Sequence, residues 1–187
     1  MADAGQVKTD ELDPQAEARR RLALAQIRQY PDPALRMQAR EVDEFDDDLV
    51  RLVARMTRLM TDANGVGLAA TQVGILQRVF VFRSRDEETV NVVVNPQIVE
   101  RGPETEVDEE GCLSLQGVLV PVERNLRVTV EGRDETGGEV RFELEALTAR
   151  VAQHELDHLD GVLILDRTTA ESRREALAVL RPRVALA

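Results

Sequence analysis

The two histidines of the chain, His154 and His158, stand four positions apart in a stretch that favours a helix. On an α-helix this spacing places both imidazoles on one face, a turn apart, so both rings can bind one metal ion. Glu155 lies about 100° further round the helix than His154, where its carboxylate can reach a water held by that ion. Thr148 is the expected N-cap of this helix, and Gly161 is placed to end it.

A third ligand has to come from elsewhere, because a His-Glu-x-x-His pattern is short and also occurs by chance on solvated helices. The chain has one cysteine, Cys112, in the segment Glu110-Gly111-Cys112-Leu113-Ser114. A free cysteine is more often a buried thiol without a chemical role. Combined with the two histidines, however, it would give a three-ligand site with an open fourth position, which is typical of catalytic metal sites.

Composition limits the class of protein. The chain has 187 residues, of which 43% are hydrophobic and 32% charged, as expected for one soluble domain. Its net charge of −11 and aromatic content of 3% argue against a DNA-binding surface. No apolar run approaches the ~20 residues that a membrane-spanning helix needs. A lone cysteine and the absence of a signal-like amino terminus predict a cytoplasmic protein.

The helical elements are expected in three further places. Residues 1–26 form an N-terminal extension, flexible at first and then helical from Asp13 and Pro14, and residues 27–187 form a single catalytic domain. Apolar residues recur at helical spacing between Phe45 and Asn64. Thr168 and Glu171 match a capping box that opens a final helix, which should stop before Pro182.

Between these helices the apolar period changes to two, which is typical of strands. The predicted strands are 78–82, 90–94, 97–100, 118–122, 126–131 and 139–146, with a hairpin turn at 135–138 before the last. Strands that follow one another without helices between them favour antiparallel pairing. The predicted fold class is therefore α+β, with antiparallel β-sheets packed around a central metal-binding α-helix and a C-terminal helix.

The run Gly65-Val66-Gly67-Leu68-Ala69-Ala70-Thr71-Gln72 is rich in small residues and ends in a side-chain amide. Its glycines permit unusual backbone dihedrals and close approach by a ligand. A phosphate-binding loop is disfavoured because the run lacks a terminal lysine and a third glycine. A helix end followed by a tight bend is the remaining structural interpretation.

Taken together, three segments resemble the signatures of peptide deformylases, metallohydrolases that remove the formyl group from the initiator methionine of new bacterial and organellar polypeptides. These signatures are Gly-x-Gly-x-Ala-Ala-x-Gln, Glu-Gly-Cys-x-Ser and Gln-His-Glu-x-Asp-His-Leu, and all three occur here in that order. The resemblance extends from about residue 27 to residue 167. It implies a central helix surrounded by antiparallel sheets, and nascent formyl-Met polypeptides as substrates.

The resemblance also implies a metal site and a proton carrier. Cys112, His154 and His158 would be the ligands of one divalent metal, with Fe2+ as the native ion and Zn2+, Ni2+ or Co2+ as substitutes. By ligand chemistry alone, a thiolate and two imidazoles also suit zinc. Glu155 would act as general base toward the attacking water and then as general acid toward the leaving amine.

Four further residues have roles implied by their motif positions. The side-chain amide of Gln72 and the backbone N–H of Leu113 would stabilise the negative charge that develops on the formyl oxygen. Gly67 and Gly111 would present backbone to the substrate peptide, which is expected to lie beside them as an added strand.

The chain departs from the family pattern at one position near the site and carries an unusual charge at its end. Many family members have an arginine seven residues after the ligand cysteine, where this chain has Leu119, so contacts to the far end of the peptide are expected to differ. The final helix region has a net charge of +3, which by family analogy suggests docking on ribosomal RNA. A solvated helix face is the alternative. The charged residues counted are Arg167, Arg173, Arg174, Arg181, Arg183, Glu171 and Glu175.

Two other functions fit parts of the sequence. A zinc peptidase of the His-Glu-x-x-His type normally has a downstream third ligand, and here only aspartates and glutamates remain for that role. A non-catalytic metal or redox module could hold iron through Cys112. The presence of Glu155 and Gln72 argues against such a module, because simple metal storage requires neither side chain.

Overall fold

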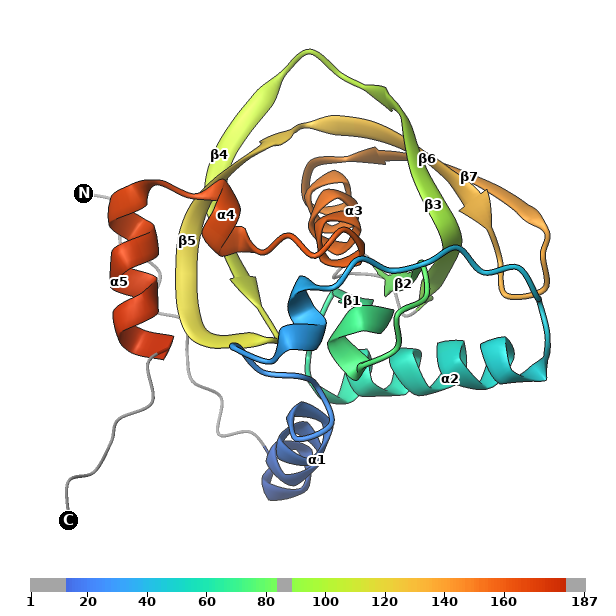
Figure 1. Cartoon of the computed structure of the whole chain (residues 1–187), viewed down its shortest axis with the longest axis horizontal. Coiled ribbons are helices and arrows are strands. Elements are labelled where there is room, and N and C mark those ends of the chain that lie inside the picture. Colours follow the sequence, from blue (N-terminus) through green and yellow to red (C-terminus); the bar gives the residue numbers. More distant parts are fainter. Residues whose placement is uncertain (1–12, 84–88, 181–187) are drawn as a thin grey trace.

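The helix that carries both histidines, α3 (Ala146–Leu159), lies at the centre of the molecule with strands curving around it (Figure 1). This computed structural model describes residues 13–83 and 89–180. Polar and charged residues of α3 are buried together with its apolar ones, among them Arg150, Gln153 and Asp157. A helix buried in this way needs internal partners for its polar side chains, and the surrounding strands supply them.

The ends of α3 confirm one prediction and correct another. Gly161 has a φ of +73° and follows the last turn, as expected for a helix-ending glycine. Thr148 is not the N-cap, because the helix already begins at Ala146, directly after a strand. Thr148 instead lies in the first turn, where its hydroxyl donates to the carbonyl oxygen of Glu145 over 2.8 Å. The chain therefore passes from strand to helix without a capping loop.

Two antiparallel sheets surround α3, which confirms the α+β class (Figure 1). The larger sheet has the strand order β1-β2-β3-β6-β7, and the smaller one is the hairpin β4-β5. The strands are β1 (Gly67–Ala69), β2 (Val79–Phe82), β3 (Asn91–Arg101), β4 (Thr105–Cys112), β5 (Leu115–Asn125), β6 (Arg127–Arg133) and β7 (Glu139–Glu145). The histidines and Cys112 consequently come from different structural units.

The predicted strands are found, with differences in number and extent, and β1, at residues 67–69, has no predicted counterpart. Segments 90–94 and 97–100 form one strand, β3, whose pairing with β6 shifts register between Val94 and Gln97. Asn95 lies at this register shift, and its side chain is fixed by two hydrogen bonds to Val42. Its Oδ1 accepts from the Val42 N–H over 2.8 Å, and its Nδ2 donates to the Val42 carbonyl over 2.9 Å. Strand β4 was not predicted, since its acidic and largely exposed sequence lacks an apolar alternation. The alternation predicted for β7 is confirmed by its burial pattern.

The helices at the two ends of the chain begin with side-chain caps. Asp13 caps α1 (Pro14–Leu24), as predicted. The final helix is α5 (Ala170–Leu180), and the hydroxyl of Thr169 accepts from the N–H of Ser172, so the capping residue is one later than the predicted Thr168. The predictions for the first 12 residues and for the stop before Pro182 lie outside the described residues.

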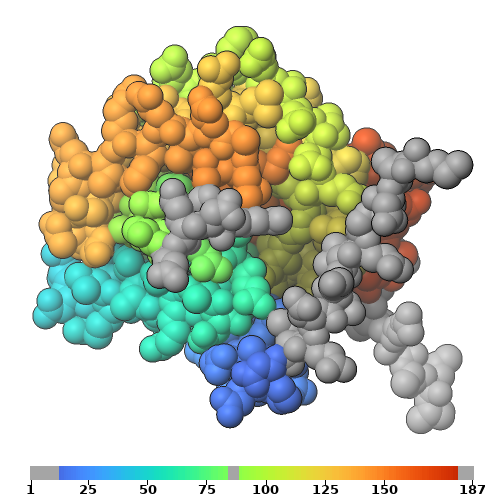
Figure 2. Space-filling view, turned by 180° about the vertical axis from the view of Figure 1, so that it is seen from behind, coloured from blue at the N-terminus to red at the C-terminus, as the bar shows by residue number. Residues whose placement is uncertain are grey.

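The core is divided by α3 and the larger sheet. α2 (Asp47–Asp62) confirms the first long helix and packs its buried face against one side of the sheet. A second cluster lies between the sheet and α3, and a third joins β5 to the short α4 (Ile164–Arg167) and to α5. Figure 2 shows α2 along the lower edge of the molecule, with α1 projecting below it. Among the described residues, no helix has the length and apolar character needed to cross a membrane.

Candidate metal centre

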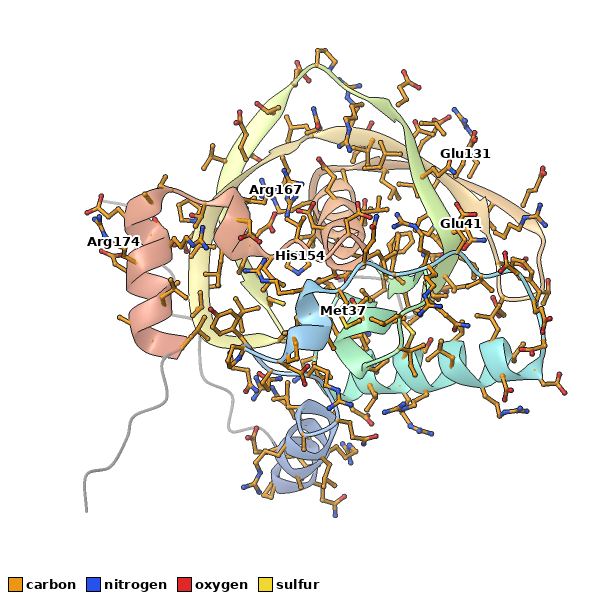
Figure 3. All side chains as sticks on the ribbon, viewed as in Figure 1. Met37, Glu41, Glu131, His154, Arg167 and Arg174 are labelled. Atoms are coloured by element: carbon orange, nitrogen blue, oxygen red, sulfur yellow. The ribbon has the colours of Figure 1, made fainter. Side chains whose placement is uncertain are left out.

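Cys112, His154 and His158 meet between α3 and the end of β4. The Cys112 Sγ and the His158 Nε2 are 3.2 Å apart, and the Nε2 atoms of the two histidines are also 3.2 Å apart. One potential ligand atom from each residue lies within 4.8 Å of the others. In Figure 3, His154 lies on α3 inside the ring of strands. The structure thus brings together the three residues that the sequence singled out as ligands.

The end of β4 shapes the position of the thiol. The β4-β5 pairing shifts register between Glu110 and Cys112, and the chain then turns back so that Cys112 pairs with Leu115. The N–H of Ser114 and the side-chain amide of Gln72 both point at the sulfur, over 3.4 and 3.6 Å. Donors directed at sulfur stabilise a thiolate, which is the form that binds metals.

This donor set fits a divalent metal ion. A tetrahedral ion with bonds of about 2.0–2.1 Å to imidazole nitrogen needs those nitrogens about 3.3 Å apart. The separation of the two Nε2 atoms, 3.2 Å, meets that requirement. Beside them, the Oε2 atom of Glu155 is buried without a hydrogen-bond partner among the described residues. An unpaired buried carboxylate oxygen is costly unless a ligand or a water occupies the site.

Glu110 orients the first histidine. The Nδ1 atom of His154 donates to Glu110 Oε2 over 3.0 Å, which leaves Nε2 free to bind a metal. Burial alone would raise the pKa of Glu110, but hydrogen bonds from His154 and Arg124 outweigh it and hold the pKa at about 2. Glu110 is therefore an acceptor throughout the neutral range, and the tautomer of His154 is fixed.

Glu110 belongs to a buried network of charges. Arg124 donates twice to Glu110, over 2.9 and 3.0 Å, and once to Asp157, over 2.6 Å. Arg150 also donates to Glu110, and Arg167 makes two hydrogen bonds to Asp157. Because each buried carboxylate has arginine partners, the cost of removing these charges from water is offset by short charge-assisted hydrogen bonds.

Sequence reasoning assigned no role to this network. Its members come from β4, β5, α3 and the segment after α3, so no local pattern connects them. The available signal was chemical: Glu110 and Asp157 are acids inside the two ligand-bearing motifs, each one or two residues from a ligand. An acid held so close to a metal ligand is a candidate for the group that orients it.

Burial sets the protonation of the two residues deepest in the site. It raises the pKa of Glu155 to about 7, which suits a group that takes and returns a proton near neutrality. It lowers the pKa of His158 well below the usual value, so that this imidazole is neutral and able to bind a metal. At His154, burial alone would lower the pKa, but hydrogen bonds with Cys112 and Glu110 outweigh it and raise the pKa, so a metal ion that binds Nε2 has to displace a proton from this ring.

The absence of a side chain at Gly67 leaves the space that the Glu155 carboxylate occupies. A Cβ atom at position 67 would lie 2.3 Å from Glu155 Oε1 and 2.8 Å from a methyl carbon of Val151. Real Cβ atoms do not approach other atoms so closely, so a larger residue would displace the carboxylate. Gly67, which is predicted to contact substrate, is therefore also required by the packing of Glu155.

The predicted charge-stabilising residues are close to the metal ligands. Gln72 is buried, its Oε1 accepts from the N–H of Ala69 over 2.9 Å, and its Nε2 donates to Ser114 Oγ over 3.0 Å. The carbonyl of Leu113 accepts from Gln29 Nε2 over 3.0 Å, which anchors the turn after Cys112. The Gln72 side chain and the Leu113 backbone are thus each held by a hydrogen bond to a neighbouring residue.

One cleft of about 930 Å³ collects these residues. Seven predicted site residues line it, and His158 is buried at its base with 1% of its surface exposed. The seven are Gly67, Gln72, Gly111, Cys112, Leu113, His154 and Glu155. A cleft of this size is at the upper end of those that hold small ligands, so there is room for several residues of an extended peptide.

Comparison with known proteins gives one consistent result. The family model described as polypeptide deformylase matches residues 24–174. The peptide deformylase of Thermotoga maritima is 48% identical over 147 residues, which cover 79% of this chain and 88% of that protein. Peptide deformylase 1 of Corynebacterium glutamicum is 42% identical over 162 residues, covering 86% and 96%.

Solved structures agree with the sequence matches. The crystal structure of a peptide deformylase from Legionella pneumophila has a TM-score of 0.79 and 39% identity, covering 82% of this chain and 91% of that one. The crystal structure of peptide deformylase from Thermotoga maritima has a TM-score of 0.73 and 48% identity, covering 76% and 96%.

The role of Glu110 in orienting His154 predicts the effect of Glu110→Gln on metal binding. The amide keeps the size of the side chain but removes the charge that fixes the imidazole, so affinity for Zn2+ should fall by about 10- to 100-fold. Competition with a chromogenic chelator measures this affinity, and circular dichroism reports whether the fold is retained. Glu109→Gln, at the exposed neighbouring position, is the control and should leave affinity unchanged. Equal affinities for the two folded variants would contradict the role given to Glu110.

Proposed function

The chain belongs to the polypeptide deformylase family, and from this premise we propose that Cys112, His154 and His158 hold its catalytic metal ion. The protein is a metal-dependent hydrolase that removes the N-formyl group from the initiator methionine of new polypeptides and releases formate. The observation that carries the site assignment is the meeting of the sole cysteine with both histidines beside an unpaired buried carboxylate.

We propose Fe2+ as the native ion, with Zn2+, Ni2+ or Co2+ as substitutes. The mixed thiolate and imidazole set is compatible with each of these borderline-soft ions. When bound, such an ion supplies Lewis acidity, which makes water a nucleophile near neutral pH. Glu110 keeps His154 in the tautomer that can bind it, and the buried arginines keep Glu110 ionised.

Glu155 is the proposed proton carrier. Its Oε2 atom has no partner among the described residues, and its pKa of about 7 places it between the two protonation states at neutral pH. As a carboxylate it takes a proton from the attacking water. As a carboxylic acid it returns that proton to the amine nitrogen as the bond to the formyl carbon breaks.

Gln72 and Leu113 are the proposed donors to the negative charge that develops on the formyl oxygen. One amide hydrogen of Gln72 is used at Ser114, over 3.0 Å, whereas the contact from Nε2 to the Cys112 sulfur is long, at 3.6 Å. The second hydrogen is therefore available for a better acceptor. Because Ala69 fixes the amide oxygen, this donor needs little reorganisation when charge appears.

The substrate peptide is proposed to bind as an added strand. β1 is one of the two edge strands of the larger sheet, and β4 has one partner, β5. Gly67 on β1 and Gly111 on β4 both line the cleft. Extended peptides bind such edges through main-chain hydrogen bonds, which accept many sequences. This mode suits an enzyme whose substrates share only their first residue.

The decisive experiment measures formate release from formyl-Met-Ala-Ser by protein purified without oxygen. Cys112→Ala should lose both bound metal and activity, because it removes a ligand. Glu155→Gln should keep the metal but lose about 100- to 10,000-fold in rate, because it removes the proton carrier. Internal cleavage of unformylated peptides would indicate a zinc peptidase instead. Unchanged activity in Glu155→Gln would contradict the assignment of Glu155.

Gly67→Ala tests the packing of the site. The added methyl group would press on Glu155, so the rate of formate release should fall by at least about ten-fold while metal content stays at one ion per chain. Gly102→Ala is the control, because its Cβ would meet only Arg127, at 3.2 Å or more. Loss of metal in Gly67→Ala would show that the residue supports the ligands rather than Glu155.

We also propose that residues 27–187 form the catalytic domain, that the enzyme works in the cytoplasm, and that α5 docks on the ribosome. Ion pairs reduce the number of arginines that are available to contact RNA, because Arg167 is paired with Asp157 and Arg173 lies 4.0 Å from Asp166. Arg174 is exposed on the outer side of α5 (Figure 3). Arg181 and Arg183 lie outside the described residues.

Charge reversal at Arg174 tests this docking. Arg174→Glu should weaken co-sedimentation with ribosomes by about an order of magnitude and make it less dependent on salt, because a phosphate contact is replaced by repulsion. Arg51→Glu, at an exposed position of α2, is the matched control. Equal co-sedimentation of the two variants would leave α5 as a solvated helix.

A further inference from the structure

Helix α1 lies before the region that matches the family model, apart from its last residue, Leu24. It nevertheless contributes to the catalytic cleft. The family match begins at residue 24, whereas α1 starts at Pro14. Arg20 and Leu24 both line the cleft, and their spacing of four places them on one face of the helix. One face of this helix therefore forms part of the cleft wall.

α1 is anchored firmly enough to hold that face in position. Ala23, Leu24 and Ile27 belong to the core cluster that also contains the buried residues of α2. Asp13 caps the first turn through the N–H of Gln15. The neighbouring Arg19 is exposed and does not line the cleft, unlike Arg20. The helix thus places Arg20, and not Arg19, in the wall of the cleft.

Arg83 faces the same cleft from the end of β2. Its Nε atom donates to the carbonyl of Gly65 over 3.3 Å, which holds the side chain beside the glycine run. Within residues 13–83 and 89–180, neither Arg20 nor Arg83 forms an ion pair with a carboxylate. We call Arg20 and Arg83 the arginine rim.

The other charges of the cleft do not cancel the arginine rim. Glu110 is already bonded to Arg124, Arg150 and His154. Glu155 lies beside the metal ligands, and Glu109 is exposed on β4. Among the described residues that line the cleft, cationic side chains are therefore in excess away from the metal ligands, although the chain as a whole carries a net charge of −11. Such a local reversal of sign favours anionic groups on a ligand.

We propose that the arginine rim binds a carboxylate of the substrate peptide downstream of formylmethionine, and that Arg20 is a specificity-determining residue. The carboxylate comes either from an acidic side chain or from the C-terminus of a short peptide. This inference rests on the proposed function of the cleft. The metal end receives the formyl group, and the added strand between β1 and β4 carries the following residues past the rim. Carboxylates are the groups that guanidinium forks bind best.

Matched peptides test the proposal with the intact enzyme. The first pair is formyl-Met-Ala-Glu amide and formyl-Met-Ala-Gln amide, and the second is formyl-Met-Ala-Ser with a free or an amidated C-terminus. In at least one of the two pairs, the wild type should prefer the member with the carboxylate. The expected preference is about two- to five-fold in kcat/KM and comes mainly from a lower KM, as expected for a partly exposed ion pair. The first pair reports a side-chain carboxylate and the second reports a C-terminal one.

Variants of α1 show whether Arg20 causes the preference. Arg20→Ala should abolish the preference, so that kcat/KM becomes equal for the charged and neutral members of each pair, and Arg20→Lys should retain part of it. Arg19→Ala is the matched control on the same helix and should behave like the wild type. Raising the salt concentration should reduce the preference of the wild type but not alter Arg20→Ala.

Two results would overturn the proposal. One is a wild type that releases formate equally from both members of each pair, and the other is a preference that persists in Arg20→Ala. Failure of the proposed function looks different, because no peptide would then yield formate. An effect of Arg20→Ala that is equal for charged and neutral peptides would indicate a structural role of α1 and would also contradict the carboxylate site.

Discussion

A single buried carboxylate, Glu110, joins the two units that form the metal centre. It lies on β4 two residues before Cys112, and it bonds His154 on α3, Arg124 on β5 and Arg150 on α3. The hairpin that carries the thiol is thereby tied to the helix that carries the imidazoles. Further polar bonds support the same junction, since Arg124 donates to Asp157 and Arg150 donates to the carbonyls of Val122 and Glu106.

Much of the fold follows from local sequence patterns, such as residue spacing and apolar periodicity. The spacing of His154 and His158 with Gly161 behind them predicts α3, the apolar period predicts α2, and the alternation of β7 predicts its two faces. The proposed catalytic and ligand residues follow from three short motifs, because their chemistry requires particular side chains at particular spacings. The structure brings these motifs to one cleft, as the family resemblance implied.

The remaining features depend on contacts that no local pattern contains. Strand β4 is acidic and exposed, and pairing with β5 rather than apolar burial defines it. Thr148 resembled a cap because strand β7 was not expected to enter α3 directly. The partners of Glu110 are distant in sequence, and Arg20 faces the cleft only because Leu24 and Ile27 insert into the core beside α2. Long-range packing therefore decides which charged residues surround the site.

The separation of the ligands between a hairpin and a helix has a consequence for the whole molecule. The thiol belongs to the two-stranded sheet and both imidazoles to α3, so an ion held by them as proposed would cross-link the hairpin and the helix. An ion that binds the native arrangement and not the unfolded chain adds to stability by mass action. The stability of the fold would then depend on the concentration of free metal. Oxidation of the Cys112 sulfur would lower both the stability of the protein and its metal-dependent activity.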